Sequence, residues 1–563
     1  MLGKDTGQRD LFDVGNVFSV ELKPGSFYAQ LAQAAPRLFR DEDFAALYAD
    51  KVGRPSVPPS LLALVVLMQH ETGVSDAEAV ERTGLDLRWA AVLRRAAGEP
   101  LCAKSTLQMF RSQLVLHDAV GDIFRKSIEE ARRSGLLKDK ALRIAIDTKP
   151  MNGRGAVQDT YNLLAQGIRD LVRVLCHKTR MRPQDWMRTQ GLSRYAASSL
   201  KGSADIDWSD EGVRQSLLAE MVSDARALLE AAAGGGDAVD KASRLLRALL
   251  LQDVVEGVRE EGDPRASIRE GTAPGRIPSV SDPEQRHGHK SKSKLFTGHK
   301  SAIAVDEESA IITSVGVLPG DAGDATGSLE LVEQTEENTG LPVEHTLGDC
   351  AYGGAANRES FAKDGRTLYA KVPQEPQAGG MFPKRAFVLD LDNHTTTCPE
   401  GRVCDTYRDD GDGGKTFLFG RVCADCELRA FCTHSKSGRT LHVHSHERML
   451  RDARAFQESP EGRSVLRRRV VVEHRLARLG QLRIGQARYV GRGKSQFQLT
   501  IAAAIANFRR TWNWVAARIA FDDTAISSRW PFGALLAAVV GVMGALLVTR
   551  SAPPHPRHAR LAA

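Results

Sequence analysis

Two apolar segments of this chain each run into an aspartate. Residues 141–150, ALRIAIDTKP, alternate apolar with other side chains, which predicts a strand with one buried face that leads into Asp147. Pro150 and two glycines downstream predict that the chain turns away at once. Val343–Leu347 leads in the same way into Asp349 and a glycine turn. A carboxylate at such a place is costly to desolvate unless it is paired or binds a cation, although Asp147 alone could equally be a turn residue or a helix cap.

The elements around these strands follow a definite order. We expect a hairpin at 296–305 and 310–317, a helix at 326–338, a helix at 357–364, a strand at 367–372 and a closing helix at 462–480. This is the order of an RNase H-like core, so we predict an α/β fold with a mixed sheet. Asp147, Asp349 and Glu473 of the closing helix would then converge. Three such carboxylates repel one another unless divalent cations lie between them, and oxygen ligands favour magnesium or manganese.

The 563-residue chain is too long for one ordinary core, and changes in composition divide it into several regions. The expected regions are an N-terminal segment (1–48), an all-helical domain (49–138), the catalytic core (139–160, 285–380 and 446–515), a helical insertion (161–275), a Cys-rich module (381–445) and a tail (516–563). The Pro- and Gly-rich residues 264–283 are expected to be a linker. The short helices of the second region fit a helix-turn-helix DNA reader or a plain bundle.

Charge and targeting signals point to an intracellular protein with a polyanionic partner. The net charge is only +7, but the segment 463–510 contains many arginines and one acidic residue, Glu473, and the segment 286–300 is also basic. No N-terminal signal peptide is visible, so we expect a cytoplasmic, nucleoid-associated protein. The uncharged stretch 532–549 fits a tail anchor, a packed helix or an extension outside any domain. We do not expect a membrane protein.

Five of the eight cysteines lie between residues 398 and 432, with the spacing Cys398-x5-Cys404-x18-Cys423-x2-Cys426-x5-Cys432. A Cys-x2-Cys pair with two further thiols within reach meets the tetrahedral requirement of structural zinc. The expected zinc ligands are Cys398, Cys423, Cys426 and Cys432. Cys404 is a spare thiol in this interpretation, and His434 is a lower-ranked alternative ligand.

The residues around the three acids resemble the DDE transposases of bacterial insertion sequences. The matching segments are Ile146–Lys149, Gly348–Gly353, Arg469–Glu473, Gly485–Arg492 with Gln498–Thr500 and Asn507, and Arg54–Leu114 with its Ser105-Thr106-Leu107 motif. The resemblance covers about residues 50 to 515. It implies an RNase H-like transposase domain, a helical DNA-binding domain before it and a Cys-rich insertion.

The resemblance also implies a reaction and its participants. Asp147, Asp349 and Glu473 would hold two Mg²⁺ or Mn²⁺ ions while Arg469, one turn before Glu473, binds a phosphate or orients the glutamate. Water would first cut the DNA at an element end, and the freed 3′-hydroxyl would then attack target DNA. The expected DNA contacts are Arg54, Ser105, Thr106, Arg111, Lys149, Arg468, Arg488, Arg492 and Lys494. A homodimer is expected in the DNA complex, and no small-molecule substrate is expected.

Two departures from the family pattern affect these expectations. Relatives carry Tyr-x2-Arg-x3-Glu-x6-Lys around the third acid, but Leu466 and Gly480 stand at the Tyr and Lys positions here. The helical insertion separates two core strands that a simple core joins by a tight turn. A non-catalytic DNA-binding descendant of a transposase and a simple nuclease with the same core therefore remain as alternatives.

Overall fold

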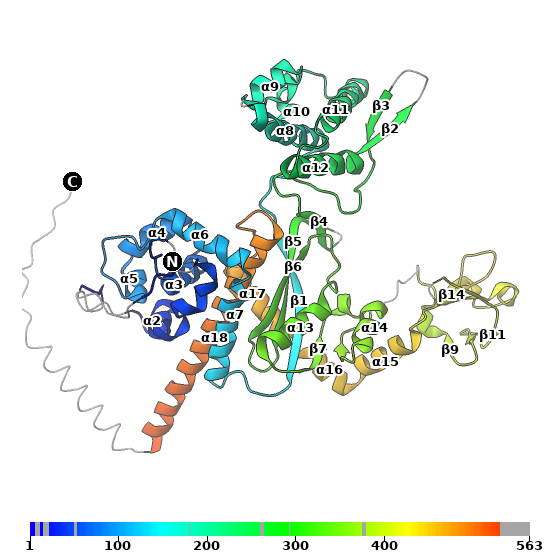
Figure 1. Ribbon diagram of the computed structural model, residues 1–563. Helices are drawn as coiled ribbons and strands as arrows, with labels where there is room; N and C mark the ends of the chain where they lie inside the picture. Colours follow the sequence, from blue (N-terminus) through cyan, green and yellow to red (C-terminus); the bar gives the residue numbers. More distant parts are fainter. Residues whose placement is uncertain are drawn as a thin grey trace, which may run out of the picture.

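A central mixed sheet carries helices on its faces, and two smaller units extend from it (Figure 1). The computed structural model describes residues 1–5, 12–14, 22–49, 53–179, 181–258, 264–291, 293–373, 379–411 and 413–529. Most of the predicted tail, with the apolar stretch 532–549, lies outside these residues. Within the described ranges, no helix is both long enough and apolar enough to cross a membrane.

The central sheet has six strands, which are β1 (Leu142–Asn152), β4 (Arg286–Ser291), β5 (Lys294–Asp306), β6 (Ile312–Pro319), β7 (Val343–Leu347) and β8 (Leu368–Tyr369). Their order is β4-β5-β1-β7-β8, and β6 also pairs with β5. β5 runs antiparallel to β1, β4 and β6, whereas β1, β7 and β8 run parallel to one another. The fold is therefore the mixed α/β fold that the sequence predicts.

The register of β1 and β7 brings the two aspartates to one level of the sheet. Ala145 lies opposite Leu347, and Asp147 and Asp349 each follow two residues later. The turn expected directly after Asp147 is wrong, because β1 continues to Asn152 and pairs with β5 along this whole stretch. Asp147 thus lies inside a long strand, at the point where its shorter neighbour β7 ends.

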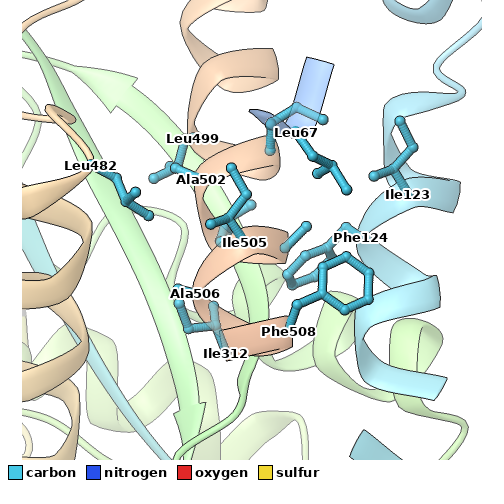
Figure 2. Close-up of a cluster of buried hydrophobic side chains, with 14 of the residues drawn as sticks. Leu67, Ile123, Phe124, Ile312, Leu482, Leu499, Ala502, Ile505, Ala506 and Phe508 are labelled. Carbon is cyan, nitrogen blue, oxygen red and sulfur yellow. The ribbon is translucent and has the colours of Figure 1, made fainter. Parts of the chain in front are cut away.

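Helices cover the sheet and continue its core. They are α13 (Ser328–Thr339), η3 (Cys350–Tyr352), α14 (Ala355–Lys363), α15 (Glu447–Glu458), α16 (Pro460–Arg467), α17 (Val470–Gln481) and α18 (Arg492–Arg529). α17 packs against β1 and β5, and α18 packs against β6. Figure 2 shows α18 at the centre of this core, where Ile505 and Phe508 lie among Leu67, Ile123 and Phe124.

The helices that precede the sheet share its hydrophobic core. They are α2 (Phe27–Leu38), η1 (Asp41–Leu47), α3 (Pro59–Thr72), α4 (Asp76–Leu85), α5 (Leu87–Leu93), α6 (Lys104–Leu116) and α7 (Val120–Arg133). Ser75 is the N-cap of α4, since its hydroxyl accepts a hydrogen bond from the Glu78 amide at 3.2 Å. One continuous cluster of buried side chains joins these helices to β1, β5 and α18.

The chain between β1 and β4 forms a separate helical unit with its own core (Figure 1). Its elements are α8 (Thr160–Thr179), α9 (Pro183–Thr189), η2 (Ser193–Tyr195), α10 (Leu200–Ser203), α11 (Glu211–Ala231), α12 (Asp237–Asp253), β2 (Val254–Val258) and β3 (Pro264–Ile268). The expectation of an unstructured linker from residue 264 is wrong at its start, because β3 pairs with β2 in a hairpin. Backbone pairing there satisfies amide groups that an irregular linker leaves to water.

The Cys-rich unit extends beyond α14 and α15, on the side of the sheet away from the N-terminal helices (Figure 1). It consists of short elements, namely η4 (Lys384–Ala386), β9 (Val388–Asp390), β10 (Thr395–Thr397), β11 (Val403–Cys404), β12 (Tyr407–Asp409), β13 (Lys415–Leu418), η5 (Gly420–Cys423), η6 (Arg429–Phe431) and β14 (Thr440–Val443). Its core is small: eight buried residues, three of them cysteines, form the cluster.

Candidate active site

Asp147 and Asp349 reach the same site from adjacent parallel strands. Asp147 projects from β1, and Asp349 follows the last residue of β7 and caps η3, where its side chain accepts a hydrogen bond from the Ala351 amide at 2.8 Å. The negative charge of Asp349 contributes to the raised pKa of Asp147. The structure therefore brings together the two aspartates that the sequence singles out.

Asp147 is largely buried, with 19% of its side chain exposed. Burial raises the pKa of Asp147 from its ordinary value of 3.8 to about 6, and the negative charges of Asp349 and Asp324 act in the same direction. A hydrogen bond from the Thr148 amide, at 2.7 Å, and the positive charge of Arg469 oppose this rise. The site thus disfavours its own negative charge when no cation is bound.

Glu473 stands in the first turn of α17, where Arg469 links it to Asp147. The Arg469 guanidinium is hydrogen-bonded to the Glu473 carboxylate, and its Nη1 lies 3.6 Å from Asp147 Oδ2. Glu473 is more exposed than Asp147, with 49% of its side chain in contact with solvent. Arg469 is therefore the cation that holds the two acids in this structure.

A break in the closing helix sets the position of Arg469. The single helix expected over 462–480 is wrong: α16 ends at Arg467 and α17 begins at Val470, with Arg469 as its N-cap. Across the break, the amides of Val471 and Val472 donate hydrogen bonds to the carbonyls of Arg468 and Arg469, each three residues earlier in the chain. We attribute the break to three consecutive valines, whose branched side chains disfavour continuous helix, after a run of mutually repelling arginines.

A further carboxylate near the site, Asp324, follows β6 and was not singled out from the sequence. Asp324 Oδ1 accepts hydrogen bonds from the Thr148 hydroxyl and from Lys300 Nζ, both at 2.8 Å. Lys300 also donates to the Ala322 carbonyl at 2.7 Å, which fixes this loop to β5. The only signal in the sequence is an aspartate shortly after a strand, and such residues are too common to identify a site. Tyr352 is a second neighbour that sequence reasoning missed.

Lys149 fills the space beside Gly480, where relatives carry a lysine. Its ammonium donates to the Leu476 carbonyl of α17 at 3.4 Å. A Cβ atom at Gly480 would lie 2.7 Å from Lys149 Nζ, so a side chain at 480 requires Lys149 to move. Lys149 was expected to contact DNA, but in this structure it ties β1 to the last turn of α17.

The other expected DNA-binding residues divide into internal and exposed groups. The Arg111 guanidinium is buried against Asp76, with Nη1–Oδ1 and Nη2–Oδ2 distances of 2.5 and 2.7 Å. Arg488 Nη2 donates to the Val74 carbonyl at 2.5 Å and lies 3.7 Å from the same aspartate. These two arginines join the N-terminal helices to the segment before α18. The exposed or partly exposed group contains Arg54, Ser105, Thr106, Arg468, Arg492 and Lys494.

The four cysteines expected to bind zinc line one small cavity of the Cys-rich unit. Cys398, Cys423, Cys426 and Cys432 share this cavity with Phe387 and Arg439, among others. Burial raises the pKa of the Cys432 thiol, and the other three cysteines add to this effect. Cys404 is buried outside the cavity, with its thiol 3.5 Å from the Thr406 carbonyl oxygen, and all these cysteines are free thiols. His434 does not line the cavity.

Neither site is arranged as a finished metal site. Across the described ranges, no group of three or more His, Cys, Asp or Glu side chains has positions that could hold a metal ion. In the acid cluster, Arg469 lies between Asp147 and Glu473. A divalent ion would have to replace this arginine.

Comparisons with known protein families match two separate segments of the chain. Residues 397–512 match a family model described as "Transposase DDE domain", and residues 17–113 match one described as "Transposase domain (DUF772)". The chain therefore carries a segment similar to DDE transposase domains and a second segment similar to another transposase domain. No curated protein and no solved structure matches it in these comparisons.

The two matched ranges cover only part of the candidate site. The DDE match contains Arg469, Glu473 and the cysteine cavity, and the other match contains Arg54, Ser105 and Arg111. Asp147 and Asp349 lie between the two matches. The register of β1 and β7 associates the two aspartates with each other, and the contacts of Arg469 associate Asp147 with Glu473.

Proposed function

We propose that this protein cuts and joins DNA at the ends of an insertion sequence, with Asp147, Asp349 and Glu473 holding divalent ions. The observation that carries the proposal is the register of β1 and β7, which sets both aspartates at one level beside the Glu473 helix. The strand arrangement β6-β5-β1-β7-β8, with one antiparallel and one parallel half, supports an RNase H-like core for this sheet.

The chemistry of the acid cluster fits a divalent cation. Carboxylate oxygens are the ligands that Mg²⁺ and Mn²⁺ prefer. Burial, together with the negative charges of Asp349 and Asp324, raises the pKa of Asp147, and a bound cation would favour its charged form. Two bound ions would activate the attacking oxygen and stabilise the leaving oxygen in phosphodiester transfer. Arg469 is held by Asp147 and Glu473 in the metal-free chain, and once released it is placed to bind a DNA phosphate.

DNA would approach over the exposed basic residues. Arg468 lies shortly before Glu473 in the chain, and Arg492 and Lys494 lie in the first turn of α18. All three side chains are exposed to solvent, so their positive charges can bind DNA phosphates. We place the protein in the cytoplasm with its DNA. Because strand transfer joins element ends to a target, we expect two copies of the chain in the DNA complex.

We also propose that Cys398, Cys423, Cys426 and Cys432 bind one structural zinc ion. The four thiols line one cavity, and four cysteine ligands are a set that structural Zn²⁺ commonly takes. The unit around them has only a small apolar core, so a metal would supply much of its stability.

Strand transfer with DNA that carries the element ends tests the catalytic proposal. The wild-type chain should join ends to target DNA in Mg²⁺, and Asp349→Asn should lose this activity while it still binds DNA. Asp205→Asn, which changes an exposed acid of the helical insertion, is the matched control and should retain activity. Cleavage without joining by the wild type would indicate a nuclease. DNA binding without either reaction would indicate a non-catalytic descendant.

A further inference from the structure

The hairpin of β4 and β5 continues past the end of β1 as a two-stranded ribbon. The Gly153 amide, directly after β1, donates a hydrogen bond to the Thr297 carbonyl at 2.8 Å, and farther out β5 pairs with β4 alone among the described strands. In this outer part, His289 lies opposite Leu295. Because β1 and β7 run parallel, the ribbon projects from the end of the sheet at which β7 leads into Asp349. Figure 1 shows β4 and β5 at this end, close to the helical insertion.

The ribbon is basic, and its outer lysines are exposed. Residues 286–300 contain four lysines, one arginine and no acidic residue. At the root of the ribbon, Arg286 donates to two backbone carbonyls at 2.6 and 2.8 Å, and Lys300 pairs with an aspartate at 2.8 Å. Lys290 and Lys294 lie farther out and are exposed, and neither takes part in an ion pair within the described part of the chain. Their charges are therefore available to a ligand.

An apolar side chain stands among these charges. Leu295 is 79% exposed, the highest value for a large apolar residue in the described ranges. Single exposed leucines are common on protein surfaces, so exposure alone assigns no role to it. Here, however, Leu295 follows Lys294 and lies across the ribbon from the exposed His289. Positive charges around an apolar tip are complementary to duplex DNA, which offers phosphates at the rim of a groove and apolar base edges inside it.

The root of the ribbon is held in one position. A Cβ atom at Gly288 would lie 2.1 Å from the Gly320 carbonyl oxygen and 2.5 Å from the Phe296 ring, so these groups pack directly against the glycine. Across the ribbon, His287 Nδ1 lies 2.9 Å from Thr297 Oγ1. A ligand that binds the tip therefore does not have to order the ribbon first, which lowers the entropic cost of binding.

The ribbon also extends the basic surface at the start of α18. Glu284, just before β4, accepts a hydrogen bond from the Arg492 amide at 2.8 Å, so the exposed start of α18 lies beside the root of the hairpin. In β5, Ile303 pairs with Asp147, and Leu295 comes eight residues earlier. At about 3.3 Å per residue, the tip lies about 26 Å along the strand from the level of Asp147, which is the length of about eight base pairs of DNA.

We propose that the β4–β5 hairpin enters the major groove of a DNA duplex, with Lys290 and Lys294 on phosphates and Leu295 against the base edges. A two-stranded ribbon fits this groove, which is about 12 Å wide and displays the methyl groups of thymine. The inference rests on the proposed function, because it takes DNA as the partner. It requires neither a bound metal ion nor DNA cleavage.

DNA binding in EDTA, with full-length protein, tests the inference without the chemical steps. The probe is a fluorescent duplex of about 30 base pairs and arbitrary sequence, because phosphate contacts do not depend on sequence. The double variant Lys290→Ala, Lys294→Ala should lower the slope of log affinity against log salt concentration by about two. Leu295→Ala should weaken binding by about tenfold with an unchanged slope, because it removes an apolar contact and no charge.

The double variant Lys138→Ala, Lys140→Ala is the matched control. Both lysines are exposed and pair with Glu308, and they precede β1 at the opposite end of the sheet. This control should bind DNA as the wild type does. All variants should keep the wild-type thermal transition, because the substituted side chains are exposed.

Three results would overturn the inference. They are an unchanged salt slope for the hairpin double variant, an equal loss of slope in the control, and wild-type affinity of Leu295→Ala. A hairpin that docks a protein partner instead of DNA would give wild-type DNA binding in every variant. A wild-type chain that does not bind the duplex would refute DNA as the partner in the proposed function itself.

Discussion

Asp147 carries a charge that the folded chain disfavours. Its pKa rises from 3.8 to about 6 on folding, chiefly through burial, so the folded state holds this proton over a pH range in which the unfolded state has released it. Stability from this group is therefore present below about pH 4 and is lost as the pH rises to about 6. The neutral variant Asp147→Asn avoids this loss.

We expect metal-free Asp147→Asn to gain stability relative to the wild type as the pH rises from 4 to 7, by about 2–3 kcal/mol in total. Urea unfolding in EDTA at several pH values measures this difference. A difference that does not change with pH would contradict the assigned pKa. In Mg²⁺ the order should reverse, because the asparagine is a poorer ligand for the ion.

Arg111 and Lys494 were both expected to contact DNA, but only one of them is free to do so. Arg111 forms a buried two-point ion pair that holds the pKa of Asp76 well below its usual range. Arg111→Ala should therefore destabilise the fold by about 3–5 kcal/mol, because Asp76 loses its principal partner. Lys494→Ala should leave the free energy of unfolding unchanged and weaken DNA binding. The dependence of the DNA affinity on salt concentration should fall by the equivalent of about one phosphate contact. Unfolding curves and DNA titrations at several salt concentrations distinguish the two.

At the scale of the element, the side chain of Asn507 joins α18 to the edge strand β6. Asn507 Oδ1 accepts from the Ile312 amide and its Nδ2 donates to the Ile312 carbonyl, both at 2.8 Å. The residue is fully buried, and its Nδ2 also lies 3.2 Å from the Ser127 hydroxyl of α7. One asparagine therefore joins β6, α7 and α18.

Asn507→Ala should cost about 2–4 kcal/mol of unfolding free energy, because it leaves two backbone groups of Ile312 buried without partners. Asn513→Ala is the control on the same helix, since Asn513 makes an exposed hydrogen bond with Gln30 and should be nearly neutral. Chemical denaturation measures both variants. Equal effects would show that α18 is held by its apolar contacts alone.

At the scale of the whole molecule, the described residues form three hydrophobic clusters, which differ in what stabilises them. The largest joins the N-terminal helices to the sheet, the second belongs to the helical insertion, and the third is the small core of the Cys-rich unit. Only the third is too small to fold on apolar burial alone. Metal removal should therefore unfold one unit and leave the other two intact.

We expect the chain to contain one zinc ion, and Cys423→Ser to lose it and become sensitive to protease between residues 381 and 445. The main thermal transition, which reports the largest cluster, should stay unchanged. Cys404→Ser is the matched control and should retain the zinc, because Cys404 lies outside the cavity. Metal analysis and limited proteolysis test both variants, and a wild-type chain without zinc would refute the site.

Local patterns in the sequence were sufficient to predict the central strands, the acids Asp147, Asp349 and Glu473, and the cluster of cysteines. Alternation of apolar residues and the chemistry of carboxylates and thiols are local properties, so the sequence alone carries them. The order of the predicted elements added the association of the three acids, the family resemblance added the expected reaction, and the two family matches support a transposase.

Only the tertiary structure decided which charged residues are internal. Nothing in the local sequence distinguishes Arg111 from Lys494, because burial of an arginine depends on an aspartate 35 residues away in the chain. The same holds for Lys149 beside Gly480 and for the register that aligns Ala145 with Leu347. The strand that leads into Asp147 was visible in the sequence. Its continuation to Asn152 was not, because pairing with β5 rather than local preference keeps that stretch extended.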